Sequence, residues 1–122
     1  MTSCLTVDDS KVVRKAIIRM LNELSITARE AADGQEALAA CAQEMPDFIL
    51  LDWNMPIMNG LEFLKTFRSN KANDHVNVIF CTTENELHKI QEALVNGVNE
   101  YIMKPFDLEV LKNKLIQIGI IC

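Results

Sequence analysis

Residues 48–56 read Phe48-Ile49-Leu50-Leu51-Asp52-Trp53-Asn54-Met55-Pro56, and the organisation of the whole chain can be worked out from them. The four apolar residues at the start predict a short strand that is buried on both faces. Asp52 then lies where this strand changes into a loop. Open α/β sheets place their reactive groups at such points.

Short apolar strands alternate with amphipathic helices five times along the chain. Strands are expected at residues 5–7, 27–30, 48–51, 76–81 and 100–103, and helices at residues 12–24, 35–43, 61–67, 86–95 and from 107 onward. This alternation is typical of an α/β domain with a doubly wound parallel sheet. A chain of 122 residues corresponds to one domain, which we expect to span residues 1–122.

Composition excludes several classes of protein. The chain has 17 acidic and 12 basic residues, a net charge of -5 and no arginine after Arg68, so direct binding to nucleic acid is not expected. No segment approaches the roughly 20 apolar residues of a membrane span, so we expect a cytoplasmic protein without membrane insertion. The four cysteines are scattered without zinc-ligand spacing and are interpreted as reduced apolar residues.

Polar residues follow four of the predicted strands: Asp8-Asp9, Asp52, Thr82-Thr83 and Lys104-Pro105. Taken singly, these groups are most often helix caps, ordinary strand ends or turns. A parallel sheet, however, gathers the carboxyl ends of its strands at one edge, so all four groups are expected to meet there. Their joint presence favours a functional site.

The chemistry of these groups suits phosphoryl transfer. Three carboxylates, those of Asp8, Asp9 and Asp52, repel one another unless a cation shares the site, and Mg²⁺ prefers such oxygen ligands. With the charge neutralised, Asp52 can act as a nucleophile toward a phosphoryl donor. Lys104 can pair with Asp52 and later with a phosphoryl oxygen, and the Thr82 hydroxyl can donate to another. The bond before Pro105 can adopt the cis form.

Three other classes that use related folds or chemistry fit less well. A carrier of flavin mononucleotide needs a phosphate loop after the first strand, where Asp8-Asp9 would repel the phosphate. A dehalogenase-type phosphatase needs a second carboxylate two residues after its nucleophile, where Trp53-Asn54 follows Asp52 here. A P-loop nucleotidase is excluded because the chain has no GxxxxGK[ST] motif.

With these residues the whole chain resembles a response-regulator receiver domain of two-component signalling, and it is similar to the stand-alone chemotaxis type, which is CheY-like. The resemblance implies a flavodoxin-like sheet of five parallel strands in the order 2-1-3-4-5 with five helices. It also implies Mg²⁺-dependent, reversible phosphorylation of an aspartate by a histidine kinase or a histidine phosphotransfer protein. Such a protein catalyses its own phosphorylation and dephosphorylation and is not otherwise an enzyme.

The resemblance assigns a role to each matching position. Asp8, Asp9 and Asp52 would bind the metal through their carboxylates, and Asn54 through its backbone carbonyl. Asp52 would also be the phosphoacceptor, and Lys104 would bind the phosphoryl group. Thr82 would supply the switch hydroxyl, and Tyr101 would be the aromatic residue that turns inward. Asn54 and Glu84 would also flank the path of water toward phosphorylated Asp52. A short phosphoryl lifetime of seconds to minutes is therefore expected, unless both are merely solvated loop residues.

The expected output surface comprises the fourth helix, the fifth strand and the fifth helix, where a downstream protein would bind. Exposed candidates on it are Tyr101, His88, Lys89, Glu92, Lys112 and Asn113. The alternative interpretation is that these residues form a charged helix face that is simply solvated. We expect a monomer in the unphosphorylated state. Two alternatives stay open: a receiver module of a larger effector protein, or a phosphate sink or phosphorelay receiver.

Overall fold

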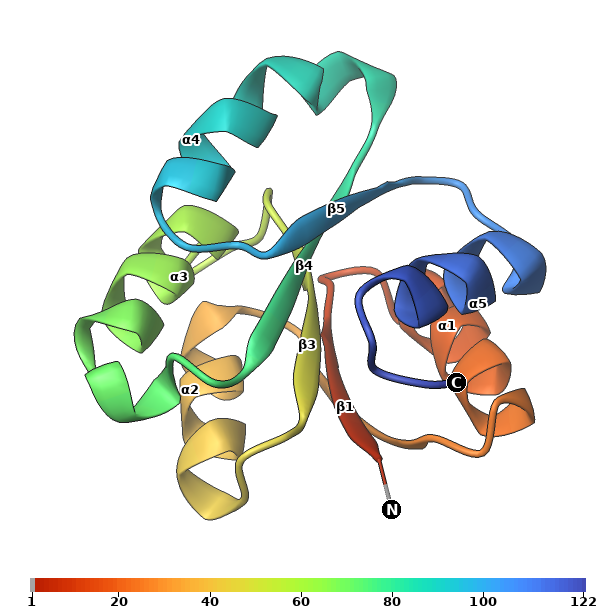
Figure 1. The fold of residues 1–122 in the computed structure, drawn as a ribbon. Coiled ribbons are helices and arrows are strands. Elements are labelled where there is room, and N and C mark those ends of the chain that lie inside the picture. The colour runs from red at the N-terminus through yellow and green to blue at the C-terminus, as the bar shows by residue number, and fades with distance from the viewer. Residues whose placement is uncertain (1) are drawn as a thin grey trace.

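The computed structural model describes residues 2–122, and within them five parallel strands form one sheet in the order β2-β1-β3-β4-β5 (Figure 1). The strands are β1 (Ser3–Val7), β2 (Thr27–Ala31), β3 (Phe48–Asp52), β4 (Asn77–Thr82) and β5 (Glu100–Met103). The helices are α1 (Lys11–Glu23), α2 (Gly34–Gln43), α3 (Gly60–Ser69), α4 (Ile90–Val95) and α5 (Leu108–Gln117), with the 3₁₀ segments η1 (Lys71–Asn73) and η2 (Glu84–Lys89). The predicted fold class and strand order are confirmed.

Helices cover both faces of the sheet. In Figure 1, α1 and α5 lie on one side, and α2, α3 and α4 lie on the other. The strands alternate between the two cores: Ile49 and Leu51 of β3 belong to the core under α2, α3 and α4, whereas Phe48 and Leu50 belong to the core under α1 and α5. A strand buried on both faces reads as a continuous apolar run, which is why β3 was detectable in the sequence.

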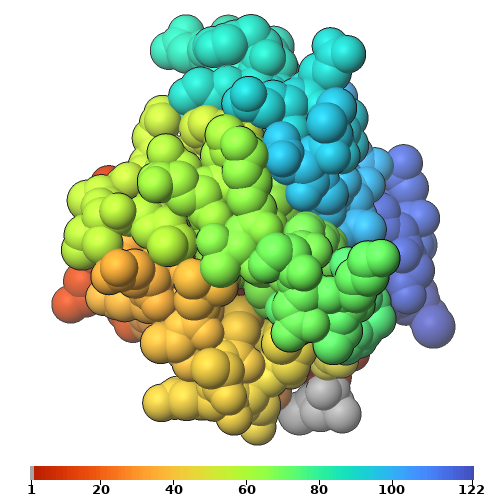
Figure 2. All heavy atoms as spheres, turned by 90° about the vertical axis from the view of Figure 1, so that its left-hand side faces the viewer, coloured from red at the N-terminus to blue at the C-terminus, as the bar shows by residue number. Residues whose placement is uncertain are grey.

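The larger core lies beneath a continuous layer of helices. Figure 2 shows α2, α3 and α4 side by side over this face of the sheet. Phe63 and Phe67 of α3 stack against each other with ring centroids 5.3 Å apart, and both are buried. Trp53, just after β3, joins the same core and contacts Phe80 of β4 at 5.0 Å between ring centroids.

Three of the four cysteines are buried as the sequence predicts, whereas Cys122 is exposed. Cys4 and Cys81 lie in the core under α1 and α5, and Cys41 lies on the opposite side of the sheet. All three are buried free thiols. Among residues 2–122, no helix combines the length and the apolar character needed to span a bilayer.

The sequence predicts one α-helix over residues 86–95, and this prediction is wrong for the first part of the segment. Residues Glu84–Lys89 form the 3₁₀ helix η2, and α4 covers only Ile90–Val95. Glu86 is 8 % exposed because its carboxylate turns inward and binds the neighbouring loop after β3. These tertiary bonds hold a tighter turn than the periodic pattern alone predicts.

Side-chain caps define where most of the longer helices begin. Ser10, Asp33 and Asp107 each accept a hydrogen bond from a backbone N–H in the first turn of α1, α2 and α5. Asn59 and Glu62 form a reciprocal capping box at the start of α3. These caps place the amino ends of the helices at the same edge of the sheet as the carboxyl ends of the strands.

Gly60 allows α3 to start directly against the end of β3. Its N–H donates to the Trp53 carbonyl at 2.9 Å. A Cβ atom at this position would lie 2.4 Å from the Asp52 backbone oxygen and 3.0 Å from the Trp53 Cα. Only a residue without a side chain fits this contact, so Gly60 helps to fix the backbone that carries Asp52.

We expect Gly60→Ala to lower the free energy of unfolding by about 1–3 kcal/mol, because the added methyl group must displace backbone rather than a flexible side chain. Urea denaturation followed by circular dichroism measures this change. The control is Lys65→Ala, an exposed position in the same helix, which should change the stability by less than about 0.5 kcal/mol. Equal stabilities for the two variants would contradict the contact.

Candidate functional site

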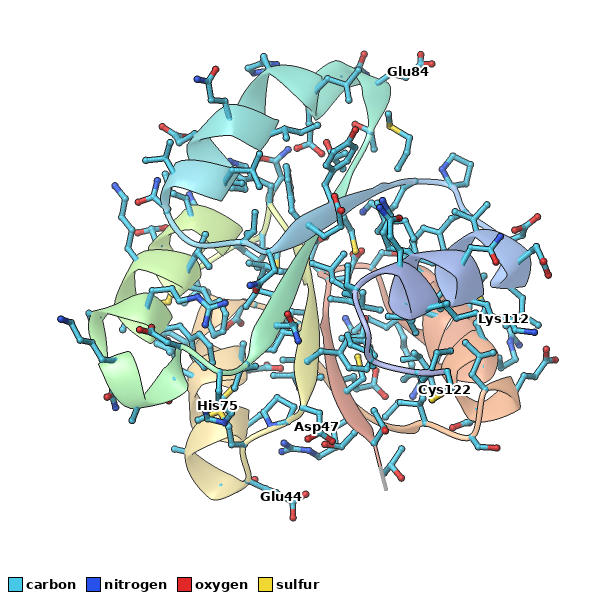
Figure 3. The ribbon with its side chains drawn as sticks, viewed as in Figure 1. Glu44, Asp47, His75, Glu84, Lys112 and Cys122 are labelled. Carbon is cyan, nitrogen blue, oxygen red and sulfur yellow. The ribbon has the colours of Figure 1, made fainter. Side chains whose placement is uncertain are left out.

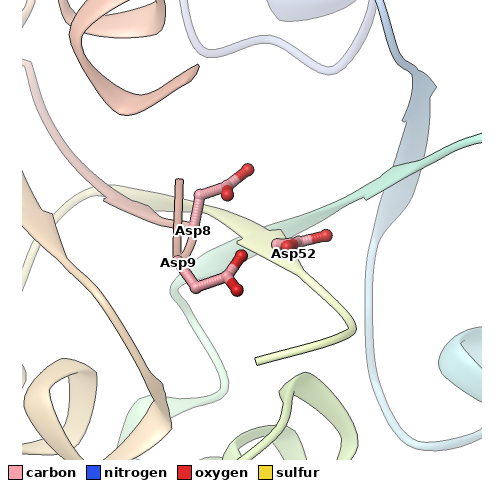
Figure 4. Close-up of side chains that lie close together, drawn as sticks. All are labelled: Asp8, Asp9 and Asp52. Carbon is pink, nitrogen blue, oxygen red and sulfur yellow. The ribbon is translucent and has the colours of Figure 1, made fainter. Parts of the chain in front are cut away.

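An acidic cluster lies at the carboxyl edge of the sheet. Asp8 and Asp9 follow β1 and Asp52 ends β3, and each offers an oxygen within 4.8 Å of the other two (Figure 4). Asp8 and Asp52 are buried, whereas Asp9 is exposed. The Asp8 carboxylate also accepts a hydrogen bond from the Ser10 N–H at 2.9 Å, which orients it beside the start of α1. The sequence-based expectation that these strand ends meet is confirmed.

Lys104, which follows β5, reaches across the sheet edge into this cluster. Its Nζ lies 3.2 Å from Asp8 Oδ2 and 3.2 Å from Asp52 Oδ1. Its backbone N–H donates to the Thr82 carbonyl at 2.6 Å, so the ends of β4 and β5 are tied together. The Lys104–Pro105 peptide bond is cis, as the sequence allows.

Burial and charge act in opposite directions on Asp52. Removal from water, opposed by the Lys104 ammonium and assisted by the Asp8 carboxylate, raises the pKa of the Asp52 carboxyl group to about 6. Burial lowers the pKa of Lys104, but the carboxylates of Asp52 and Asp8 outweigh this effect, so that its pKa is raised overall. Lys104 therefore stays protonated at neutral pH and balances part of the acidic charge.

The donor set fits a magnesium ion. Mg²⁺ binds oxygen ligands at about 2.1 Å in an octahedron, so ligands on opposite sides of the ion are about 4.2 Å apart. The three carboxylate oxygens lie within a similar span. Asp9 adds an exposed acceptor at the rim, where an ion could keep several waters. The cluster thus has the ligand chemistry and the size that Mg²⁺ requires.

Thr82 ends β4 beside the cluster and is fully buried. In this structure its hydroxyl donates to the Thr83 carbonyl at 3.2 Å. The Thr83 hydroxyl in turn donates to Glu86 Oε1 at 3.4 Å. The strand end that carries the predicted switch hydroxyl is therefore connected to η2.

A second polar cluster joins the loop after β3 to η2. The Asn54 side-chain amide donates through Nδ2 to Glu86 Oε2 and accepts through Oδ1 from Lys89 Nζ at 3.2 Å. Lys89 and Glu86 also form an ion pair at 3.5 Å. The Lys89 ammonium lies over the Trp53 ring, 6.0 Å from its centroid. Asn54 is thus bonded at both ends of its amide group.

Glu84, which the sequence predicts beside Asn54, is placed differently. It is exposed, and Figure 3 shows its side chain projecting outward at the end of the molecule. Glu86 takes the contact with Asn54 instead. No signal along this segment distinguishes Glu86 from Glu84, because the inward turn of Glu86 is fixed by its contact with the loop after β3.

The predicted output surface is partly rearranged. Tyr101 is 37 % exposed on β5, and the Lys114 ammonium of α5 lies 5.4 Å from its ring centroid and 3.7 Å from Glu100. Lys114 was missed by the sequence analysis. His88, Glu92 and Asn113 are exposed, and so is Lys112, which points outward from α5 in Figure 3. Lys89 turns toward Asn54.

Fold and site together define an α/β domain with a carboxylate and lysine cluster at the carboxyl edge of a parallel sheet, and comparison with known proteins gives its family. The family model described as "Response regulator receiver domain" matches residues 4–116. The chain belongs to this family and is a phospho-accepting response regulator receiver. Proteins of this family are signalling proteins rather than classical enzymes, bind Mg²⁺ at an acidic pocket, and interact with kinases and downstream targets.

Relatives of similar length are chemotaxis proteins. The chain is 39% identical over 115 residues to "Chemotaxis protein CheY" of Pseudomonas aeruginosa, covering 93% of each chain, and 42% identical over 113 residues to "Chemotaxis protein CheY homolog" of Campylobacter jejuni, covering 91% and 87%. The solved structure of CheY4 of Vibrio cholerae superposes with a TM-score of 0.89 at 35% identity, covering 97% of this chain and 98% of that one. These relatives do not favour the effector-module, phosphate-sink or phosphorelay alternatives.

The raised pKa of Asp52 makes stability depend on pH. Because the folded pKa of about 6 exceeds the usual value, the contribution of Asp52 to stability is fully present at low pH and is lost as the pH rises through about 6. The Asp52→Asn variant has no carboxyl group to ionise at this position and therefore does not lose this stability. Without Mg²⁺, we expect the free energy of unfolding of the variant to rise by about 1 kcal/mol relative to that of the native protein between about pH 5 and about pH 7.5.

Urea unfolding in a chelating buffer at the two pH values measures this difference. Glu23→Gln, at an exposed carboxylate at the end of α1, is the matched control and should follow the native protein at both. A difference between Asp52→Asn and the native protein that stays constant with pH would show that Asp52 is not desolvated in the folded state.

Proposed function

We propose that this protein accepts a phosphoryl group on Asp52 in a chemotaxis-type two-component pathway, and that the whole chain of 122 residues acts as one receiver domain. The observation that carries the proposal is the Lys104 ammonium, held 3.2 Å from both Asp8 and Asp52 with Asp9 close by. This arrangement places an acceptor carboxylate and a cation together at an edge that a phosphoryl donor can reach.

Transfer would proceed from a phosphohistidine of a kinase or phosphotransfer protein. An Asp52 oxygen forms a bond to phosphorus while the bond between phosphorus and the histidine nitrogen breaks, and the nitrogen keeps the electron pair. Lys104 then pairs with a phosphoryl oxygen instead of the Asp52 carboxylate. The Thr82 hydroxyl, which needs only to rotate away from the Thr83 carbonyl, donates to another phosphoryl oxygen.

Asp8, Asp9, Asp52 and the backbone carbonyl of Asn54 would hold Mg²⁺ in this mechanism. When bound, the ion would neutralise charge on the phosphoryl oxygens and on the clustered carboxylates. Asp8 is positioned for this role by its bonds to the Ser10 N–H and to Lys104. Asp9 contributes at the exposed side, where the donor must approach.

The phosphorylated state would be read on the surface formed by α4, β5 and α5. Rotation of Thr82 would shift the adjoining segment and free space for Tyr101, which is half-exposed, to turn inward. A downstream protein would then contact residues around Tyr101, with His88, Lys89, Glu92 and Lys112 as candidates. By its likeness to CheY proteins, we place this chain in the cytoplasm, as a monomer when unphosphorylated.

We expect purified protein to become phosphorylated by acetyl phosphate only when Mg²⁺ is present, with a change in the fluorescence of Trp53. Trp53 follows Asp52 directly and is 5 % exposed, so it reports on this edge of the sheet. Asp52→Asn should show neither the fluorescence change nor added phosphoryl mass. An unchanged mass for the native protein would contradict the proposal.

The same experiment gives the phosphoryl lifetime once the donor is removed. We expect decay within seconds to minutes, because the Asn54 side chain is small and Glu84 projects outward, so that neither shields phosphorylated Asp52 from water. Release of inorganic phosphate measures the rate. A lifetime of many hours in Mg²⁺ would show that these residues do not admit water.

Asp9→Asn should weaken Mg²⁺ binding at least about tenfold, since even residues behind a metal ligand change affinity by that factor. Because Asp9 is exposed, the stability of the metal-free variant should change by less than about 0.5 kcal/mol. Titration of Trp53 fluorescence with MgCl₂ gives the affinity. Glu44→Gln, at the opposite end of the sheet in Figure 3, is the control and should bind Mg²⁺ as the native protein does.

A further inference from the structure

We propose that Glu86 and Lys89 are positioning residues that hold the Asn54 amide and thereby lengthen the life of the phosphoryl group on Asp52. This inference rests on the proposed phosphorylation of Asp52. It concerns the polar cluster of Asn54, Glu86 and Lys89, named here the amide clamp. None of the transfer steps described above uses Glu86 or Lys89.

The amide clamp occupies both hydrogen-bonding ends of Asn54. The amide nitrogen donates to the Glu86 carboxylate, and the amide oxygen accepts from the Lys89 ammonium at 3.2 Å. Hydrogen bonds to charged partners are about twice as strong as those between neutral groups. An amide held in this way is not free to donate to, or accept from, a water molecule near Asp52.

The partners of Asn54 are themselves held in place. Glu86 is 8 % exposed, pairs with Lys89 at 3.5 Å and accepts from the Thr83 hydroxyl at 3.4 Å. The Lys89 ammonium also lies 6.0 Å from the centroid of the Trp53 ring. A buried carboxylate at this place needs such partners, because an unpaired charge there would be strongly unfavourable.

Hydrolysis is the step that a released amide would promote. The oxygen of a water molecule forms a bond to phosphorus while the bond from phosphorus to the Asp52 oxygen breaks. The carboxylate keeps the electron pair, and both protons of the water leave with the phosphate as H₂PO₄⁻. A free Asn54 amide, two residues after Asp52, can orient that water. The amide clamp opposes this arrangement, so its loss should accelerate hydrolysis.

Glu86→Ala and Lys89→Met are the variants that open the amide clamp. We expect each to lose phosphate about five- to tenfold faster than the native protein, a change equivalent to about 1–1.4 kcal/mol in the barrier. Glu86→Gln keeps an oxygen that can accept from the Asn54 amide and should restore most of the native lifetime. Glu23→Ala and Lys65→Ala, at exposed positions away from the site, are the matched controls.

Two further measurements separate positioning from a general structural effect. In an Asn54→Ala background, Glu86→Ala should no longer accelerate phosphate loss, because the residue through which it acts is absent. The rate at which Glu86→Ala and Lys89→Met are phosphorylated by acetyl phosphate should differ from the native rate by less than about twofold, since donor access and water orientation are different requirements. Trp53 emission of the unphosphorylated protein should shift in Lys89→Met, since the cation over its ring is lost.

The outcomes are distinguishable from failure of the proposed function. If native protein takes up no phosphoryl group, the proposed function fails and the lifetime cannot be measured. If the native protein is phosphorylated but the amide-clamp variants decay at the native rate, only this inference is overturned. Equal acceleration by Glu86→Ala with and without Asn54 would also overturn it, because Glu86 would then act by another route.

Discussion

The shared contact of one ammonium group with two carboxylates is the interaction on which this site depends. Lys104 lies 3.2 Å from Asp8 and 3.2 Å from Asp52, at an edge where a third carboxylate, that of Asp9, is also near. Without that cation, the two buried carboxylates would face each other in a medium that screens their repulsion poorly. The contact bridges residues 96 and 52 positions apart in the chain, so it also joins β5 to β1 and β3.

Burial of Asp52 costs stability, because its carboxylate loses contact with water. Desolvation is the largest contribution to the raised pKa of Asp52, and it also leaves little water around the carboxylate that we propose as the phosphoacceptor. The backbone that carries this carboxylate has close neighbours on both sides: β3 lies between β1 and β4, and Gly60 packs against the Asp52 backbone. The fold thus holds a partly desolvated carboxylate at the sheet edge, where the Lys104 ammonium balances part of its charge.

The amide clamp extends this network toward α4, which belongs to the proposed partner-binding surface. Glu86 contacts the loop after β3 through Asn54 and the end of β4 through Thr83. A movement of the strand end that carries Thr82 would therefore displace η2 and, with it, the start of α4. In the proposed mechanism, the lifetime of the phosphoryl group and the shape of the output surface would both depend on η2.

The sequence by itself determined the fold class, the location of the acidic edge and the identity of its four groups, because short apolar runs and the polar residues that follow them are local patterns. It also indicated that the last helix begins near Asp107, since capping depends on near neighbours. Only the tertiary structure decided that η2 replaces the start of the predicted helix, that Glu86 rather than Glu84 meets Asn54, and that Lys114 accompanies Tyr101. These outcomes depend on contacts between segments far apart in the chain, which periodicity along one segment cannot encode.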